Sequence, residues 1–532
     1  MLSFGLRNLR RLVSVPPVEI KPITILVGRN SSGKSSFLRA FPLLRQSLMT
    51  KTSSPVLWFG DLVDFGSFHG AVSDNNVQKT ITFIFALDDL RFPPDVRSYS
   101  AEPQRNLKIE LEVDIGVLKY PAVQAAPNEQ THIAAFRILN VTDGVLYDAR
   151  LNDSNELFSL TINGLSALEY FSDYDLKLFQ GTVFPELLLR PKDPGSPPQN
   201  RVYLRDHLVL LDAMGRALRP FLHGSTKQDT LDRYATALLM LPTFDKETLL
   251  KLSNDIQAAQ YFKGLLSDAA TNDARSMFDT LHRIYHANRL IQILNRLSGH
   301  LRDVLANTLY IGPARVRSER YYRYQDLAVS EIDPNGTNFP MFLNSLGPHR
   351  LAELSNWVQD LFNYRIEIKS SEGHLSINLL EGSYSTNIVD TGYGVSQILP
   401  VLGQIWWAAR RPRLSDNRLR RRERLSILAI EQPELHLHPA HQALLADAIS
   451  GHAKDFPSGE PLHFVVETHS ETFVNRLGEL IADKKLDPEN VQILVFDARD
   501  EDARVTAVEI ARFGNDGELI NWPYGFFQAA QQ

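Results

Sequence analysis

The spacing of apolar and polar positions changes twice along the chain. Apolar residues recur at helical spacing between about 203 and 306, with few β-branched runs, whereas the segments on either side carry short strand-like runs separated by turns. We therefore expect an α/β fold in which a mixed sheet and an antiparallel β lobe are interrupted by a mainly helical insertion. The boundaries that this pattern predicts are 1–164, 165–307 and 308–532. Strands are expected at 3–13, 18–27, 80–87, 107–115, 134–141, 157–162, 365–369, 375–380, 425–431, 462–466 and 491–496.

One stretch carries a specific chemical signal. The apolar run 23–27 leads into a G-x-x-x-x-G-K-S motif, and an apolar helical pattern follows it. Glycines let consecutive backbone N–H groups converge on a phosphate, the lysine reaches the β- and γ-phosphates, and the first hydroxyl ligates Mg²⁺. The motif predicts binding of ATP and Mg²⁺. The expected nucleotide-binding residues are Gly28, Arg29, Asn30, Ser31, Ser32, Gly33, Lys34, Ser35 and Ser36.

Composition narrows the class of protein. A chain of 532 residues exceeds a single ordinary core, and 43% hydrophobic with 22% charged residues is typical of soluble globular proteins. There is no cysteine, which excludes disulfides and thiolate metal sites and fits a reducing compartment. No apolar run is long enough to span a bilayer, and the first residues lack the apolar core of a signal peptide. We expect a cytoplasmic protein with no membrane partner.

Acidic and polar residues follow two later apolar strands. The run 425–430 ends in Glu431, Gln432 and, after a proline, Glu434. An acid at such a strand end holds the metal of a nucleotide triphosphatase, and a neighbouring group orients the attacking water. The run 462–466 precedes His469, whose side chain could reach a γ-phosphate. These four residues are the catalytic candidates, with Glu431 and Ser35 as expected metal ligands.

Three further features leave alternatives open. Gly392, Gly394, Ser396 and Gln397 form a glycine loop before an apolar helix, a weak signal for an anion site on its own. The arginines and tyrosines at 315–324 could contact phosphates or bases, or could belong to a solvated loop. The arginine-rich segment 410–424 is by default a surface linker, with contact to nucleic-acid phosphate as the sharper alternative.

Taken in order, these motifs resemble the ATP-binding-cassette-type ATPases of the RecF, Rad50 and overcoming-lysogenization-defect group. The resemblance covers roughly 1–160 and 310–532, and it is similar in particular to the ATPase family of the Septu and retron anti-phage systems. In that group, 390–397 corresponds to the signature loop, 427–433 to the Walker B strand, and 468–470 to the switch-histidine motif. The resemblance implies that two heads sandwich two ATP molecules, so a homodimer or a higher even-numbered oligomer is expected, with an HNH-type nuclease as partner.

The chain departs from the group's pattern in two places. Where the group has a second acid as the base that positions water, this sequence has Gln432, which cannot take a proton although it can orient water. Hydrolysis is therefore expected to be slow. In addition, only about sixty residues follow His469, too few for the TOPRIM nuclease domain that some members carry.

The function expected from this resemblance is an ATP-gated regulator that positions or restrains a nuclease in anti-phage defence. Two alternatives stay open: a RecF-like ATP-dependent DNA clamp in repair, and an autonomous metal-dependent nuclease using the acids at 497–502. A hairpin turn explains those acids better, and His436 with His438 lacks a third metal ligand of convincing spacing.

Overall fold

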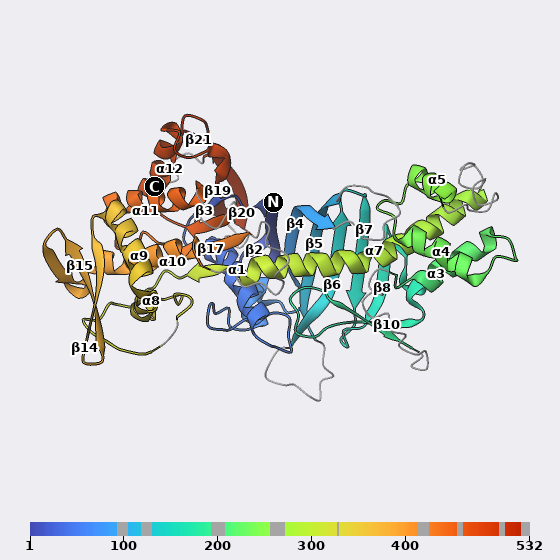
Figure 1. Ribbon diagram of the computed structural model, residues 1–532, viewed down its shortest axis with the longest axis horizontal. Helices are drawn as coiled ribbons and strands as arrows, with labels where there is room; N and C mark the ends of the chain where they lie inside the picture. The colour runs from blue at the N-terminus through green and yellow to red at the C-terminus, as the bar shows by residue number, and fades with distance from the viewer. Residues whose placement is uncertain are drawn as a thin grey trace. The chain divides into compact units, whose positions relative to one another are not determined.

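The protein divides into two compact units, each of which is described separately. A computed structural model (Figure 1) describes residues 1–92, 105–118, 130–192, 208–255, 272–326, 329–411, 425–454, 461–498 and 506–522. The phosphate-loop unit comprises Leu6–Lys51, Val56–Asn76 and Arg302–Gln532. The meander unit comprises Met1–Gly5, Thr52–Pro55 and Val77–Leu301. The meander unit thus groups the antiparallel strands with the helices that follow them.

The phosphate-loop unit is built on a mixed seven-stranded sheet of order β12-β17-β18-β3-β19-β20-β21. The first five strands of this order are parallel, and the last two pair antiparallel. Every residue of the central strands β3 and β17 is buried, as expected for strands covered on both faces. The strands are β3 (Ile23–Gly28), β12 (Leu309–Ile311), β17 (Ser426–Glu431), β18 (Leu462–Glu467), β19 (Val491–Ala498), β20 (Thr506–Phe513) and β21 (Leu519–Ile520).

Helices cover both faces of this sheet. Alternate residues of a strand point to opposite faces, and Ile23, Ile25 and Val27 belong to one core with the helices α8 to α12. Helix α1 contacts β3, β17 and β18 but contributes no residue to that core, so it packs on the other face. The helices are α1 (Lys34–Met49), α2 (Phe68–Ala71), α8 (Phe339–Ser345), α9 (Gly347–Phe362), α10 (Tyr393–Ala408), α11 (Pro439–Lys454) and α12 (Glu471–Ala482).

A smaller antiparallel sheet completes this unit. Strand β15 pairs with β13, β14 and β16, and α9 packs against β14. Two other strands, β1 and β2, precede the phosphate loop and are neighbours in a separate sheet. The bounds are β1 (Leu2–Leu9), β2 (Leu12–Glu19), β13 (Tyr322–Arg323), β14 (Arg365–Ser371), β15 (His374–Glu381) and β16 (Tyr384–Asn387).

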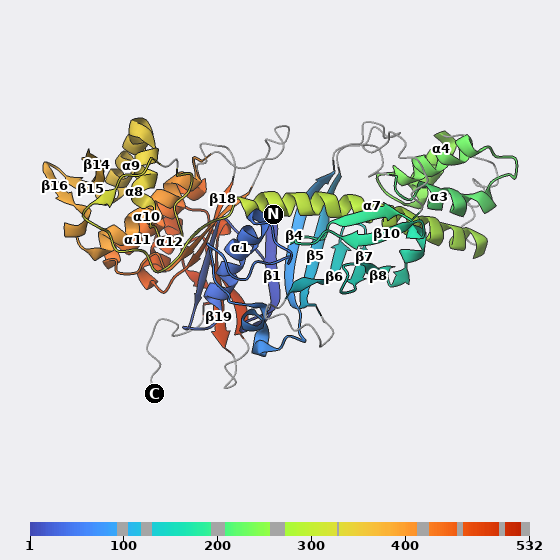
Figure 2. The same cartoon turned by 90° about the horizontal axis from the view of Figure 1, so that it is seen from below.

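The meander unit contains an antiparallel run of strands in chain order, β4-β5-β6-β7-β8-β9. The long helix α7 runs across these strands (Figures 1 and 2), and the Tyr147 hydroxyl of β7 lies 3.2 Å from His286 Nδ1 of α7. The strands are β4 (Ile81–Phe92), β5 (Arg105–Val117), β6 (Thr131–Asn140), β7 (Val145–Leu151), β8 (Leu157–Ile162), β9 (Leu165–Ser166), β10 (Tyr174–Leu178) and β11 (Leu187–Pro191). The helices are α3 (Leu211–Leu218), α4 (Gln228–Leu239), α5 (Lys246–Asp255) and α7 (Asn272–Ala306).

The predicted α/β class with a mixed sheet and an antiparallel lobe is confirmed. The segment 165–307 is less uniformly helical than expected, because the β10–β11 hairpin precedes its first helix at Leu211. Both strands of that hairpin are only five residues long, a length at which periodicity does not separate strand from helix. None of the helices that the structure describes is long and apolar enough to cross a membrane.

Candidate nucleotide-binding site

The candidate site lies at the carboxyl edge of the parallel strands in the phosphate-loop unit. The phosphate loop follows β3, Gln432 follows β17 and Thr468 follows β18, so three separate segments meet at one edge. A cavity of about 600 Å³ opens there. It is lined by Arg10, Arg11, Asn30, Ser31, Ser32, Gly33, Lys34, Ser35, Ser36, Arg39, Gln432, Glu467 and His469.

The phosphate loop has the backbone that its glycines predict. Gly28 and Gly33 have φ values of 153° and 98°, and Ser31 between them has φ 63°. A Cβ atom on Gly28 would lie 2.3 Å from the Phe496 carbonyl oxygen of β19, so this position excludes any side chain. Gly33 directly precedes α1, whose first N–H groups therefore face the cavity with the positive end of the helix dipole.

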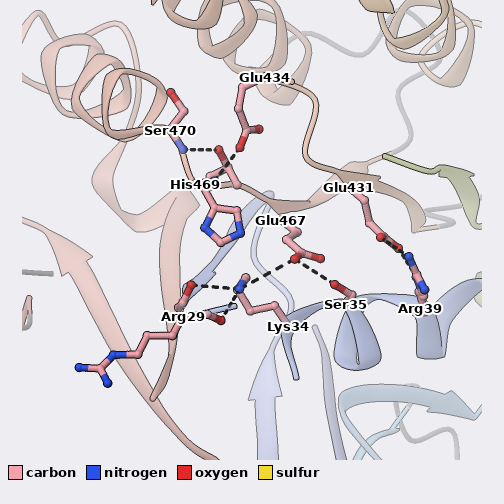
Figure 3. Close-up of polar contacts among 11 residues, drawn as sticks. Arg29, Lys34, Ser35, Arg39, Glu431, Glu434, Glu467, His469 and Ser470 are labelled. Carbon is pink, nitrogen blue, oxygen red and sulfur yellow. Dashed lines mark hydrogen bonds and ion pairs between the residues drawn. The ribbon is translucent and has the colours of Figure 1, made fainter. Parts of the chain in front are cut away.

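Lys34 is held inside the loop by backbone carbonyls. Its Nζ donates to the Gly28 oxygen at 3.0 Å and to the Arg29 oxygen at 2.8 Å, as Figure 3 shows. The side chain is buried, and this burial lowers the pKa of Lys34, while the nearby Glu467 opposes the shift. The ammonium is thus placed over the loop, where anionic phosphates would compensate its burial.

Glu467, the last residue of β18, faces the loop. The Ser35 hydroxyl donates to Glu467 Oε1 at 2.9 Å, and Lys34 Nζ lies 4.0 Å from the same oxygen. Burial raises the pKa of Glu467 to about 7; the Ser35 hydrogen bond opposes this rise and the charge of Glu431 adds to it. The sequence reasoning did not include this residue. Its position at the end of a buried parallel strand is the signal that could have found it.

Glu431 is fully occupied by other side chains. Both of its carboxylate oxygens accept from Arg39, at 2.7 Å each, and Tyr310 donates to Oε1 at 2.8 Å. The hydrogen bond to Glu431 raises the pKa of Arg39, and burial raises that of Tyr310. Glu431 is 1% exposed and does not line the cavity. The structure therefore places this expected metal ligand beside Arg39 rather than beside Ser35.

The remaining catalytic candidates lie at the same edge in different environments. Gln432 lines the cavity with φ 41°, and its backbone N–H donates to the Glu467 carbonyl at 2.8 Å. His469 also lines the cavity; burial and the charge of Lys34 lower its pKa. Glu434 lies behind it: Oε1 accepts from the His469 backbone N–H at 2.6 Å, and burial raises the pKa of Glu434. Glu434 does not line the cavity.

Two arginines that the sequence reasoning missed line the cavity from the turn between β1 and β2. Arg11 Nη1 donates to the Ser31 carbonyl at 3.1 Å. The guanidinium of Arg10 lies 4.4 Å from the ring centroid of Phe65, which belongs to the glycine-punctuated loop after α1. Gln46 of α1 fixes that loop through hydrogen bonds to the backbone of Leu57, Leu62 and Val63. Two positive charges at the mouth suit an anionic ligand.

The expected signature residues lie away from this cavity in the same unit. Gly392, with φ 88°, directly precedes α10, and a Cβ atom on Gly394 would lie 2.4 Å from the His436 carbonyl oxygen. Ser396 and Gln397 are buried, and Gln397 Nε2 donates to the Val316 carbonyl at 3.4 Å. None of these four residues lines the cavity.

The structure describes the arginines at 315–324 but only the start of the arginine-rich segment 410–424. Arg315 is not in a solvated loop: it is buried, donates to the Glu431 carbonyl at 3.1 Å, and its burial lowers its pKa to about 10. Arg320 is exposed and paired with Asp390 at 2.6 Å. Most of the arginine-rich segment (412–424) and most of the acids at 497–502 lie outside the described residues. Within the described part of the chain, no group of three or more His, Asp or Glu side chains could hold a metal ion.

Residues 325–474 match the family described as AAA ATPase domain. That stretch includes the loop before α10 and the strands β17 and β18, and strand β3, which leads into the phosphate loop, pairs directly with β18. This part of the chain is similar to an ATPase domain.

No curated protein matches the chain. Two solved structures similar to it are head domains of SMC proteins. One is the Smc head domain with an extended coiled coil, bound to the C-terminal domain of ScpA, from Pyrococcus furiosus; it is 11% identical, covers 96% of each chain and has a TM-score of 0.33. The other, from Thermotoga maritima, is 9% identical over 95% of this chain and 97% of that chain, with a TM-score of 0.31.

Proposed function

We propose that the phosphate-loop unit binds ATP with Mg²⁺ between two copies of the chain and hydrolyses it slowly, as an ABC-type switch. The observation that carries this proposal is the composition of the cavity. Lys34, Ser35 and the start of α1 face it as phosphate and metal ligands, whereas the position of the usual catalytic acid is held by Gln432. A site that can bind ATP but lacks an acid to accept the proton of the attacking water favours a long-lived ATP-bound state.

The residues fit Mg²⁺ because the Ser35 hydroxyl and a carboxylate oxygen lie side by side, and Mg²⁺ prefers oxygen ligands. When bound, the ion neutralises charge that develops on the phosphates. Lys34 would bind the β- and γ-phosphates, and the loop N–H groups would surround them. Gln432 would orient the attacking water through its amide, and His469 would contact the γ-phosphate.

In the cell, we propose that this switch regulates or positions a partner nuclease of the HNH type in an anti-phage defence system. Support comes from the resemblance of the motifs in sequence. A RecF-like clamp, acting on DNA without a nuclease, is the competing function.

The first test is nucleotide binding and turnover by the purified chain. Lys34→Ala should weaken ATP binding by roughly a hundredfold or more, because it removes the buried ammonium that faces the phosphates. Lys51→Ala changes an exposed lysine outside the cavity and should leave binding unchanged. Wild-type turnover should stay below about one per second. Undiminished binding by Lys34→Ala would end the phosphate-loop assignment, and turnover of many per second would end the slow-switch assignment.

The second test is affinity purification from the native operon with ATP and Mg²⁺, followed by native mass spectrometry. A stoichiometric nuclease on an even-numbered assembly supports the defence regulator. An even-numbered assembly that carries only DNA supports the clamp instead.

A further inference from the structure

Two glutamates are candidates for the carboxylate ligand of a metal ion in the candidate site. Glu431 ends β17 and Glu467 ends β18, and the two are register partners on adjacent parallel strands. Side chains of register partners point to the same face of a sheet, so both carboxylates lie on the face that α1 covers. Their hydrogen-bond partners decide which one can serve a metal held by Ser35.

Glu431 is held by three hydrogen bonds. Arg39 donates two parallel hydrogen bonds to its two oxygens, and Tyr310 donates a third. Such a bidentate pair is strong and geometrically specific. Moving Glu431 toward Ser35 would break all three hydrogen bonds and leave the buried Tyr310 hydroxyl without an acceptor. Figure 3 shows Glu431 directed at Arg39, away from Lys34 and Ser35.

Glu467 shows the opposite pattern. Its Oε1 accepts from Ser35 Oγ, the atom expected to ligate the metal, and its Oε2 is buried with no hydrogen-bond partner in the part of the chain that the structure describes. The residue lines the cavity, whereas Glu431 does not. A buried carboxylate oxygen without a donor is costly, and a cation or its water would satisfy it.

We propose that Ser35 and Glu467 together hold the Mg²⁺ of bound ATP, and that Glu431 is a positioning residue. Through Arg39 and Tyr310, Glu431 ties α1 to the ends of β17 and β12, which keeps the phosphate loop in place. The acid of the metal site is thus supplied by β18, one strand away from the position that the motif order predicts. This proposal rests on the proposed binding of ATP and Mg²⁺.

Mn²⁺ is a suitable probe, because its binding to the protein–nucleotide complex can be followed by electron paramagnetic resonance without any turnover. The full-length chain would be titrated with Mn²⁺ in the presence of a non-hydrolysable ATP analogue. Binding of a fluorescent ATP analogue would be measured separately in EDTA. Glu467→Gln should weaken Mn²⁺ binding by about tenfold to a hundredfold. Its metal-free nucleotide binding should be unchanged or tighter, because a negative charge near the phosphates is lost.

Glu431→Gln is the matched control. It should lower the thermal midpoint, because it weakens the Arg39 pair, while Mn²⁺ affinity stays within about twofold of wild type. Wild-type Mn²⁺ affinity in Glu467→Gln, or a loss confined to Glu431→Gln, would overturn the proposal. If Glu431→Gln does not fold, the Glu467→Gln titration alone decides. Failure of the wild-type chain to bind the nucleotide in EDTA and with Mn²⁺ would instead overturn the proposed function.

Discussion

His452 of α11 lies inside the phosphate-loop unit in surroundings that disfavour its charged form. Its Nε2 is 3.3 Å from Arg410 Nη1, its Nδ1 is 3.0 Å from the Ala448 carbonyl, and the Trp357 ring packs edge-on against it. Burial lowers its pKa from 6.5 to about 4, and the positive Arg410 adds to the shift. The unfolded chain therefore binds a proton between pH 6.5 and 4 that the folded chain does not. The stability contributed by neutral His452 is complete above pH 6.5 and is lost as the pH falls toward 4.

This shift predicts acid destabilisation of the phosphate-loop unit. Between pH 7.5 and pH 5, His452 should account for a loss on the order of 1–2 kcal/mol in the free energy of unfolding. All five tryptophans of the chain lie in this unit, so urea unfolding followed by their fluorescence reports on it alone. His452→Gln should reduce the pH dependence, whereas His349→Gln, at an 88% exposed side chain, should not. Equal pH dependence in wild type and His452→Gln would contradict the prediction.

Individual residues also show which parts of the candidate site could be predicted from the sequence and which could not. The spacing of the glycine motif is local, and its residues from Asn30 to Ser36 all line the cavity. The choice between Glu431 and Glu467 is not local. It depends on Arg39 and Tyr310, which come from other elements and carry no motif of their own. Arg10 and Arg11 were missed for the same reason: a turn before the motif gives no sign that it folds over the cavity.

At the scale of elements, strands buried on both faces were the easiest to predict. The strands β17 and β18 are continuous apolar runs, and each was expected within about two residues of its observed bounds. The end of β3 was also expected within one residue, but the expected strand 18–27 began five residues before β3 does. Strand β7 was missed, although its buried and exposed residues alternate, because its outward positions carry Asp148 and Arg150. These charges are neutralised across the sheet, for example by the pair of Arg137 with Asp148, and that pairing exists only after the strands align.

The junction between α10 and the loop after β17 provides a test at this scale. Gly394 approaches the His436 backbone so closely that a methyl group would lie 2.4 Å from the carbonyl oxygen. Gly394→Ala should therefore displace one of the two loops and lower stability by about 1–3 kcal/mol. Because Gly394 does not line the cavity, hydrolysis should fall more than ATP binding. Thermal unfolding, nucleotide titration and turnover would measure the three effects.

Gly451 is the matched control for this substitution. It lies within α11, and a Cβ atom there would have no heavy atom within 4 Å. Gly451→Ala should stabilise the protein by about 0.5–1 kcal/mol through helix propensity, with activity unchanged. A Gly394→Ala protein as stable and active as Gly451→Ala would show that the close approach at His436 is not required.

At the scale of the whole molecule, the phosphate-loop unit is discontinuous in sequence. Strand β3 lies between β18 and β19, which come more than four hundred residues later in the chain. The pattern of apolar residues predicts many of the strands, but it cannot determine that the antiparallel run after residue 77 packs with the later helices. That grouping follows from contacts such as the one between Tyr147 and His286, which are far apart in sequence.

The last prediction concerns the number of chains that complete a site. In one chain the cavity presents the phosphate loop, but Gly392, Gly394, Ser396 and Gln397 do not line it. If these residues cap ATP, as the sequence resemblance implies, they must do so on a second copy. A non-hydrolysable ATP analogue with Mg²⁺ should therefore convert the 60.2 kDa chain into an assembly with an even number of subunits, measured by light scattering after size exclusion.

Two variants test separately the two parts of the proposed site, which are the phosphate loop of one chain and the signature loop of a second copy. Lys34→Ala should stay in its nucleotide-free state at all analogue concentrations, because it removes the phosphate ligand. Ser396→Ala should bind the analogue but associate about tenfold to a hundredfold more weakly, because a hydrogen bond to a charged phosphate is worth about 1.5–3 kcal/mol. Mixing the two variants should yield at most one competent site per dimer, since each chain lacks a different half. Association that ignores the nucleotide, or that persists in Lys34→Ala, would mean that subunits meet through another surface and that the signature loop does not contact ATP.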